Sequence, residues 1–286
     1  RLKSWIESGE LTIEGESHKP RHKVKAGQDL KVEAVLEVTE EWSPQDIDLD
    51  VVYEDEHMVI INKPTGLVVH PGAGNWSGTL LNALLFRYPE LGQIPRAGIV
   101  HRIDKDTTGL MVVARTLRAH TNLVKQLSKR TMTRQYEAIA CGVMVGGSTV
   151  NKPMGRHPVN RKKMAVIEHG GKPAVTHYRV VKRYRIHTHI RVQLETGRTH
   201  QIRVHMAHER YPLLGDPVYL GRARLPAGGT EEFKESILRF GRQALHAKFL
   251  GMEHPETGEW VEWEIPLPQD MLDLLEVIKQ DQEDHA

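Results

Sequence analysis

A chain of 286 residues with 39% hydrophobic and 27% charged residues is long and apolar enough to bury a sizeable core. Its single cysteine, Cys141, excludes an internal disulfide and a cysteine-based metal cage, which suits the reducing cytoplasm. No apolar run approaches the roughly 20 residues that span a bilayer, and no secretory leader is present, so we expect no membrane partner.

The basic residues are unevenly distributed, although the net charge is only +2. Residues 115–134 hold six bases and no acid, residues 151–163 hold five, and residues 18–25 hold four. The last eighteen residues carry six acids and one base, which leaves a surplus of seven bases over residues 1–268. A single basic cluster commonly forms only a solvated surface, but three clusters without an acid favour a nucleic-acid partner.

The N-terminal 49 residues form a separate region in the sequence. A short helix ending near Gly9 precedes strands at 11–13 and 31–35, with the basic residues 18–25 between them. This segment has too little apolar surface for a core of its own, and we expect it to be mobile. Residues 39–49 are polar, include a proline and are predicted to be a linker. The simplest alternative is an irregular N-terminal arm.

From residue 50 onward, strands outnumber helices and do not alternate regularly with them. Strands are expected at 51–53, 58–61, 67–70, 134–143, 172–185, 188–195, 243–249 and 259–265, and helices at 79–88, 116–128, 199–208 and 270–279. Residues 91–98 are expected to be a mobile loop. Residues 222–241 are expected to be a surface excursion that is first rich in glycine, proline and charge and then charged and helical. The pattern predicts one α+β domain over residues 50–286, with a mixed or antiparallel sheet rather than a doubly wound one.

A cluster of polar residues lies in the middle of this domain. Residues 101–106 hold an imidazole, a guanidinium and two carboxylates between apolar runs, a pattern typical of strand, tight turn and strand. Gly109 would supply the backbone freedom of the turn. Considered alone, this polar cluster would be interpreted as the charged tip of a hairpin.

Four sequence blocks change that interpretation. They are Asn-Lys-Pro-Thr-Gly-Leu-Val-Val-His-Pro at 62–71, His-Arg-Ile-Asp at 101–104 followed by Thr-Thr-Gly-Leu, Arg-Gln-Tyr-Glu-Ala at 134–138, and Leu-Glu-Thr-Gly-Arg-Thr-His-Gln-Ile-Arg-Val-His at 194–205. In content and order they resemble the motifs of the RluA/RluD class of RNA pseudouridine synthases, with Ile103 where leucine is commoner. The resemblance implies that class's fold: a large, mostly antiparallel sheet with flanking helices and a central catalytic cleft. Residues 1–38 resemble the C-terminal part of an S4-like RNA-binding module.

The implied reaction breaks the C1′–N1 bond of a uridine and joins C1′ to C5 of the base. No atoms are gained or lost, so neither a redox cofactor nor a metal is expected. A carboxylate can attack C1′ or C6, or stabilise an oxocarbenium-like species. The resemblance implies that Asp104 is this carboxylate, whereas composition alone leaves Asp106 as a competitor.

The resemblance also implies roles for other side chains. Arg198 would pair with Asp104 and keep it ionised, and Tyr136 would stack on the target base and is a possible proton acceptor. An RNA-facing group of Arg102, Arg203 and His101 is expected around them. Arg102 would fill the gap left by the extruded uridine, Arg203 is open to a phosphate contact, and His101 would hold the turn by hydrogen bonds. Without the motifs, Tyr136 would be a core tyrosine and Arg198 a phosphate contact.

The resemblance further implies large-subunit ribosomal RNA as the partner of a cytoplasmic and monomeric enzyme. Two other classes remain open from the residues. A non-catalytic RNA-binding protein would explain the basic clusters but not the aspartate motif. A metal-dependent hydrolase could use histidines among the 17 in the chain, such as His200, His205 and His208, but no His-Glu-x-x-His is present. The sequence does not identify the uridines that are modified.

Overall fold

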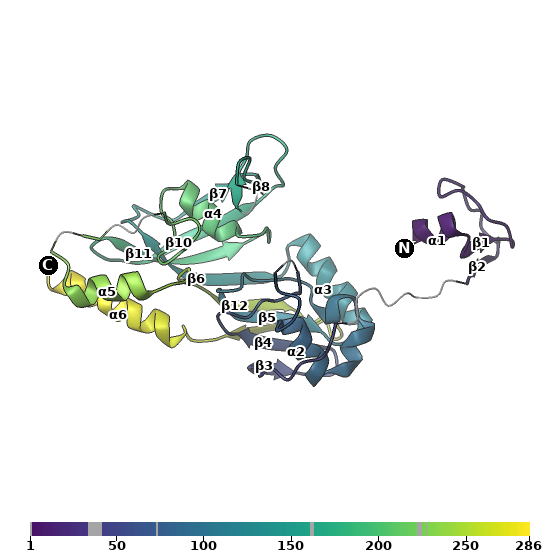
Figure 1. Ribbon diagram of the computed structural model, residues 1–286, viewed down its shortest axis with the longest axis horizontal. Helices are drawn as coiled ribbons and strands as arrows, with labels where there is room; N and C mark the ends of the chain where they lie inside the picture. Colours follow the sequence, from purple (N-terminus) through teal and green to yellow (C-terminus); the bar gives the residue numbers. More distant parts are fainter. Residues whose placement is uncertain (1, 34–41, 73, 161–162, 222–224, 227) are drawn as a thin grey trace. The chain divides into compact units, whose positions relative to one another are not determined.

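The computed structural model describes residues 2–33, 42–72, 74–160, 163–221, 225–226 and 228–286 (Figure 1). The chain divides into two compact units, residues 1–41 and residues 42–286. Residues 42–49, expected to be linker, belong to the larger unit. The buried Asn82 explains why. Its side-chain amide donates to the backbone carbonyl of Ser43 (2.8 Å), and its backbone carbonyl accepts from the N–H of Gln45 (3.0 Å). Trp42 and Leu49 also pack against the core.

The smaller unit contains the helix α1 (Leu2–Ser8) and the antiparallel strands β1 (Leu11–Ile13) and β2 (Leu30–Val32). Ile13 is buried, whereas all three residues of β2 are exposed. The second predicted strand therefore begins at residue 30, and residues 34 and 35 of that prediction lie outside the described residues. The S4-like identity of this unit stays a prediction.

The larger unit is built on a nine-stranded sheet with the order β3-β4-β5-β12-β6-β11-β10-β7, in which β13 also pairs with β12. The strands are β3 (Val51–Glu54), β4 (Met58–Lys63), β5 (Thr108–Ala114), β6 (Thr133–Cys141), β7 (Ser148–Asn151), β10 (Val175–Arg183), β11 (His187–Leu194), β12 (Leu245–Glu253) and β13 (Trp260–Glu264). The strands β8 (Met154–Arg156) and β9 (Met164–Val166) form a separate hairpin. The predicted α+β class with a mostly antiparallel sheet is confirmed.

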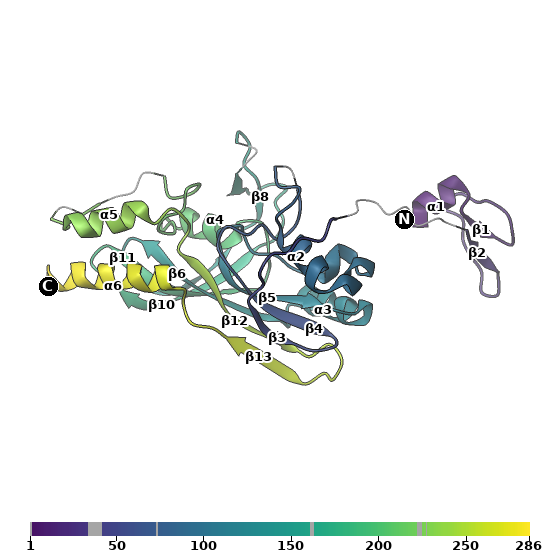
Figure 2. The ribbon, with the colours of Figure 1, turned by 60° about the horizontal axis from the view of Figure 1, so that its bottom comes forward.

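Helices cover both faces of the β4–β5 half of the sheet (Figures 1 and 2). They are α2 (Leu80–Arg87) on one face and α3 (Leu117–Lys129) on the other. The helix α4 (Gln201–His208) lies by β10 in the other half of the sheet. Because strand side chains alternate between faces, Ile61 and Met111 pack with the apolar residues of α2, whereas Ile60 and Val112 pack with those of α3. Residues 91–98, expected to be a loop, contain two 3-10 turns (Pro89–Gln93 and Pro95–Gly98), and buried Leu91 and Ile94 join the core.

The other half of the sheet is covered by the helices α5 (Glu231–Arg239) and α6 (Gln269–Glu283), which lie side by side (Figure 2). Phe233, Ile237, Met271, Leu274 and Ile278 bury their apolar faces against Ile139 of β6 and its neighbours. Each such side chain contributes about 1.5–3 kcal/mol by leaving water. The helix expected in the second part of the surface excursion is therefore present as α5, and it packs against the core.

The two halves of the sheet meet at its one parallel pair, β5 with β12, through Thr108↔His246 and Gly109↔Ala247. Gly109 has φ 113°, and a Cβ there would lie 2.3 Å from the carbonyl oxygen of Ala247. Gly109 is therefore required by the close approach of β12 rather than by a turn. The described residues of the segment before it form one isolated β-bridge with β5, Ile99↔Val113, and no strand, so the predicted strand–turn–strand is a loop that leads into one strand.

Candidate active site

Asp104 lies in the loop that ends at the start of β5, beside the seam between the two half-sheets. The Thr107 N–H donates to the Asp104 carbonyl (3.1 Å) and closes a turn. The ammonium group of Lys63, at the end of β4, donates to the carbonyl of Lys105 (2.8 Å) as well as to those of Pro64 and Leu67. The buried Lys63 therefore joins the loop that follows β4 to the loop that carries Asp104.

The other side of the Asp104 loop is held by the segment before β12. Arg242 donates to the Asp106 carbonyl (3.3 Å), and the side-chain amide of Gln243 donates to the Thr107 hydroxyl (3.0 Å). Arg242 itself binds both carboxylate oxygens of Asp270 (2.6 and 2.8 Å). Three elements far apart in the sequence thus fix the backbone on which Asp104 stands, as accurate positioning of a reactive group requires.

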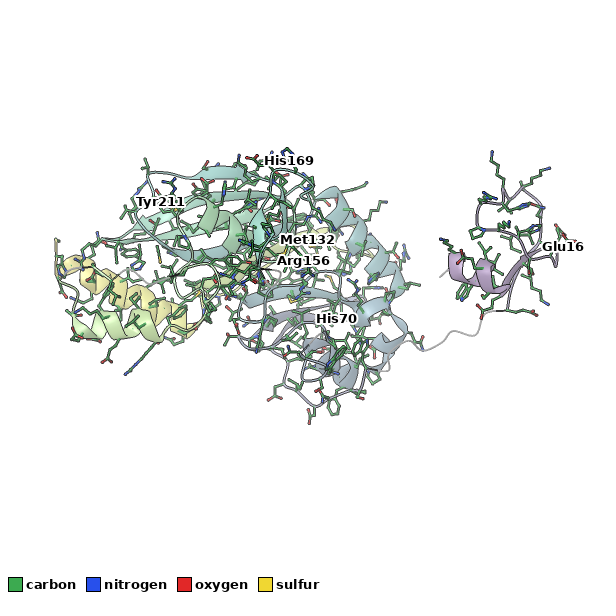
Figure 3. The ribbon with its side chains drawn as sticks, turned by 45° about the horizontal axis from the view of Figure 1, so that its top comes forward. Glu16, His70, Met132, Arg156, His169 and Tyr211 are labelled. Carbon is green, nitrogen blue, oxygen red and sulfur yellow. The ribbon has the colours of Figure 1, made fainter. Side chains whose placement is uncertain are left out.

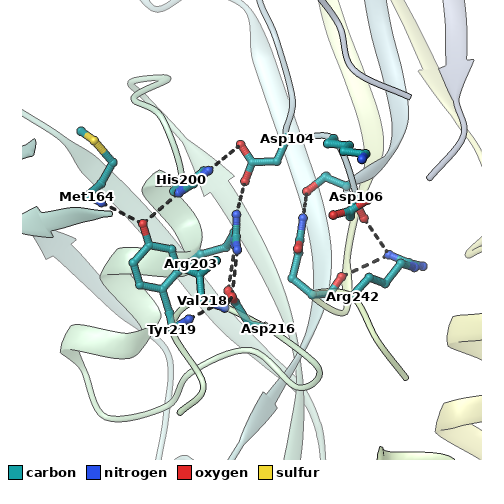
Figure 4. A network of polar contacts seen from close by, with 12 residues as sticks. Asp104, Asp106, Met164, His200, Arg203, Asp216, Val218, Tyr219 and Arg242 are labelled. Atoms are coloured by element: carbon teal, nitrogen blue, oxygen red, sulfur yellow. Dashed lines mark hydrogen bonds and ion pairs between the residues drawn. The ribbon is translucent and has the colours of Figure 1, made fainter. Parts of the chain in front are cut away.

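The carboxylate of Asp104 is paired with Arg203 of α4 (Figure 4). The Arg203 Nη1 donates to Asp104 Oδ2 (3.0 Å), while Nε and Nη2 donate to the two carboxylate oxygens of Asp216 (2.7 and 2.8 Å). Arg203 is 4% exposed. Burial alone would lower the pKa of Arg203, but the hydrogen bonds and charges of Asp216 and Asp104 outweigh burial and raise it. Arg203 is therefore a fixed positive charge behind Asp104.

This pairing corrects two expectations. Arg198 does not pair with Asp104: it is exposed in the turn before α4, where its Nε donates to the carbonyl of Pro173 (3.2 Å) and its N–H donates to Gln201 Oε1 (3.0 Å). Arg203 is buried between two aspartates and is not open to an RNA phosphate. The orientation of α4 decides the outcome, since its inward face carries Arg203 together with the core residue Ile202.

A second group, His200, also faces Asp104. Its Nε2 lies 3.9 Å from Asp104 Oδ1, and its Nδ1 is hydrogen-bonded to the hydroxyl of Tyr219 (2.8 Å), which accepts from Met164 N–H (3.0 Å). Burial lowers the pKa of His200 more than the charge of Asp104 raises it, so the imidazole is neutral at neutral pH. Figure 4 shows the Asp104 carboxylate between His200 and Arg203.

Tyr136 is buried and His101 is half-buried near this carboxylate. Tyr136, on β6, is 5% exposed, and burial raises the pKa of its phenol. The Nε2 of His101 accepts a hydrogen bond from Val112 N–H of β5 (3.2 Å), and its expected contact with RNA stays a prediction. Burial, with a smaller contribution from the charge of Arg134, lowers the pKa of His101 to about 3 and keeps the ring neutral.

Two cavities meet at Asp104. The larger is a groove of about 1020 Å³, and the smaller is a deeper cavity of about 70 Å³ bordered by Tyr136, Ile202 and Arg203. Asp104 and Arg102 line both, and Arg102 is exposed at their junction. The charged side chains that line the groove are Arg96, Arg102, Arg130, Arg134, Arg198, Lys105, Asp104 and Glu195. This excess of bases fits a polyanion.

The described residues contain neither a cluster of metal-binding side chains nor a helix that could span a membrane. In this part of the chain, no three His, Cys, Asp or Glu side chains form a group that could hold a metal ion. His205, one of the histidines considered for a metal, is hydrogen-bonded to the Thr176 hydroxyl and the Lys152 carbonyl. No helix in the described ranges is long and apolar enough to span a bilayer.

Comparison with known proteins identifies the family. The model of the RNA pseudouridylate synthase family matches residues 57–208. The chain is 57% identical over 283 residues to the ribosomal large subunit pseudouridine synthase D of Pseudomonas aeruginosa, covering 99% of this chain and 88% of that protein. The chain belongs to the RNA pseudouridine synthase family. The Escherichia coli protein of the same description is 55% identical over 286 residues, covering 100% of this chain and 87% of that one.

Solved structures of the family agree with the fold. A human protein, RNA pseudouridylate synthase domain containing 4, is 25% identical, with a TM-score of 0.64 over 80% of this chain and 93% of its own. The chain is thus an RNA pseudouridine synthase, as the four sequence blocks predicted. The motifs contained Arg203 and His200 but did not show which of their side chains would face Asp104, and Asp216 lies outside all four blocks.

Proposed function

We propose that this pseudouridine synthase isomerises specific uridines of large-subunit ribosomal RNA and that Asp104 is its catalytic carboxylate. The carrying observation is that Asp104 lines both the basic groove and the deep cavity while Arg203 holds its charge in place. Identity of 57% and 55% to two large-subunit enzymes supports the choice of RNA. The site is complete within one chain, which supports a monomer, and its ribosomal substrate supports the cytoplasm.

The arrangement suggests a division of labour at the site. Arg203 occupies Asp104 Oδ2, so Oδ1 is the oxygen left to act on C1′ or C6 of the nucleotide. Tyr136 keeps its proton at neutral pH because burial raises its pKa, which favours stacking and hydrogen-bond donation over action as a phenolate base. The neutral His200 lies beside Asp104 and is a second group to which a proton can move.

The reaction requires the uridine to leave its stack. Arg102 stands exposed at the junction of groove and cavity, two residues from Asp104, where a side chain could enter the space that the uridine leaves. Arg102→Ala is expected to reduce turnover of a uridine within a duplex about ten-fold or more and that of a single-stranded target much less, since unstacking costs a few kcal/mol only in the duplex. Equal losses on both RNAs, measured as kcat/KM, would contradict this role.

The function itself is tested by tritium release from RNA that carries tritium at C5 of uridine, with and without a chelator. Release that persists in the chelator supports the synthase. Release that the chelator abolishes would support a metal-dependent enzyme, and RNA binding without release would support a binding module. The catalytic proposal fails in either of the last two cases.

A further inference from the structure

Arg134 is a buried positive charge that the proposed reaction leaves unused. It lies on β6 two residues before Tyr136, and it is 7% exposed. It lines both the groove and the deep cavity, as Asp104 and Arg102 do. Tyr136, Ile202 and Arg203 line the deep cavity but not the groove. Arg134 therefore lies at the junction of the groove and the deep cavity, together with Asp104 and Arg102. We call this junction the throat, because a nucleotide would pass through it from the groove into the cavity.

The surroundings of Arg134 differ from those of the two other buried arginines near the site. Arg203 and Arg242 are 4% and 7% exposed, and each binds both oxygens of an aspartate. Among the described residues no carboxylate lies within ion-pair distance of Arg134. Its Nη2 donates only to the carbonyl of Glu195, at 3.4 Å, and its Nε is buried without a partner in the described part of the chain.

A buried charge without a counter-charge is costly, and folded proteins rarely keep one that serves no purpose. Perturbed and incompletely paired groups gather at functional sites. The charge of Arg134 also helps to lower the pKa of His101, so its field is felt inside the site. The absence of a counter-charge among the described residues therefore indicates that the partner of Arg134 is an anion that arrives with the substrate.

Gly197 leaves room for that anion. A Cβ at Gly197 would lie 2.8 Å from Arg134 Nη1, and Gly197 lines both cavities. Since this glycine has ordinary backbone angles, its lack of a side chain serves space rather than a turn. The glycine keeps one edge of the guanidinium accessible from the throat.

We propose that Arg134 binds a phosphodiester group next to the extruded uridine, an inference that rests on the proposed function. The position of Arg134 favours a phosphate of the nucleotide, rather than its base, as the group that it binds. Asp104 reaches the sugar at the throat, and the base extends past it toward Tyr136, so the backbone phosphates of the same nucleotide remain at the level of Arg134. A guanidinium fork matches phosphate oxygens and holds them in a fixed direction.

The test is a thermodynamic cycle between protein and RNA. RNA stem-loops that contain a mapped target uridine carry one uncharged methylphosphonate linkage, on its 5′ or its 3′ side. The wild-type protein should lose about 10- to 100-fold in RNA affinity and in kcat/KM for one of the two linkages, the range of a hydrogen bond to a charged group. Arg134→Gln should lose a similar factor on natural RNA and nothing further on the modified RNA.

The matched control is Arg118→Gln. Arg118 lies on α3 in the same basic stretch, but it is exposed and paired with Glu256 (2.9 Å), and it lines neither cavity. Arg118→Gln should still lose the full factor in RNA affinity and in kcat/KM when the methylphosphonate replaces the natural linkage, and we call this loss the methylphosphonate penalty. The proposal is overturned if Arg134→Gln keeps that penalty too, or if neither linkage matters to the wild-type protein.

Stability separates a binding role from a structural one. Removal of an uncompensated buried charge should leave the melting temperature of Arg134→Gln equal to or above that of the wild type. A fall of several degrees together with a retained penalty would assign Arg134 to the fold. If Arg134→Gln does not fold, Arg134→Lys, which keeps the charge without the fork, should show a smaller penalty than the wild type, and an unchanged penalty would overturn the proposal.

The cycle is measured on affinity as well as on turnover so that two failures can be told apart. If RNA affinity shows coupling between Arg134 and the linkage but no tritium is released, the proposed function is contradicted and the phosphate site is supported. Tritium release without such coupling would keep the function and remove the phosphate site.

Discussion

Individual buried charges decide how this site is built. Arg203 spans Asp104 and Asp216, and Lys63 places its ammonium group on three carbonyls. A charge withdrawn from water keeps its ionised state only where such partners replace the water. The partners therefore tie the position of the Asp104 carboxylate to the packing of α4 and of the loops around it.

Replacement of Arg203 should reveal this dependence. Arg203→Met leaves the Asp216 carboxylate, whose side chain is fully buried, without its partner, and we expect the free energy of unfolding to fall by about 3–5 kcal/mol. Arg198→Met should change it by no more than about 0.5 kcal/mol, because Arg198 is exposed. Urea denaturation of the two variants measures both values, and equal losses would return Arg198 to the role that the sequence predicted.

The sequence could predict the importance of Asp104 but not its partner. The motif block 194–205 contains four arginine or histidine side chains, and nothing in their order shows which one will face Asp104: Arg198, His200, Arg203 and His205. The deciding residue, Asp216, belongs to a different segment and has no recognisable pattern around it. Long-range pairing of this kind is absent from local sequence signals.

Among the elements, β6 carries both the site and the stability of the sheet. Its alternation directs Tyr136 toward the deep cavity and Glu137 to the opposite face. The Glu137 carboxylate accepts from His189 of β11 (2.8 Å) and Lys248 of β12 (2.9 Å), the strands on either side of β6. One carboxylate thus joins three neighbouring strands behind Tyr136.

Glu137 should make the fold sensitive to acid. Burial alone would raise the pKa of Glu137, but the hydrogen bonds and charges of His189 and Lys248 outweigh it and hold the pKa at about 2. Because this lies below the pKa of an unfolded glutamate, about 4.3, Glu137 stabilises the fold above that pH, and the contribution is lost as the pH falls toward 2.

Melting temperatures between pH 2.5 and pH 6 test this contribution. Those of wild type and Glu137→Gln should differ most near pH 6 and converge toward pH 2.5. A difference that stays constant over this range would contradict the assignment. The variant keeps Asp55, whose pKa is also lowered to about 2, so some acid sensitivity should remain.

Element prediction succeeded where the signal was local. The apolar spacing of residues 116–128 predicted α3, and alternation predicted β6 and the β10–β11 hairpin to within a few residues. It failed where distant contacts decide. Gly109 was predicted to serve a turn, whereas it admits the backbone of β12, and residues 91–98 were expected to be mobile, whereas Leu91 is buried by α2 and its surroundings.

Across the whole molecule, function and stability are concentrated in the larger unit. Its two half-sheets meet at the β5–β12 seam. Side chains fill the space around the ribbon in both halves of this unit (Figure 3). Of the hydrophobic residues described in the smaller unit, only Ile13 is buried. The larger unit therefore contains the groove, the deep cavity and nearly all of the described core.

A chain of residues 42–286 tests this distribution. We expect its melting temperature to lie within a few degrees of that of the full chain, because the core clusters are retained. RNA affinity should fall, since the basic residues 18–25 are lost, and the fall should lessen as salt is raised. Unfolding of the shorter chain would contradict the division into two units, and unchanged affinity would remove the smaller unit from RNA binding.

The central claim is that the Asp104 carboxylate performs the reaction, and single-turnover tritium release by Asp104→Asn measures it most directly. Asp106→Asn is the matched control, because Asp106 lies in the same loop and contributes its backbone carbonyl to the fold. The account predicts no release by Asp104→Asn, RNA affinity within a few-fold of the wild type, and release by Asp106→Asn. Release by Asp104→Asn at a rate near that of the wild type would contradict it.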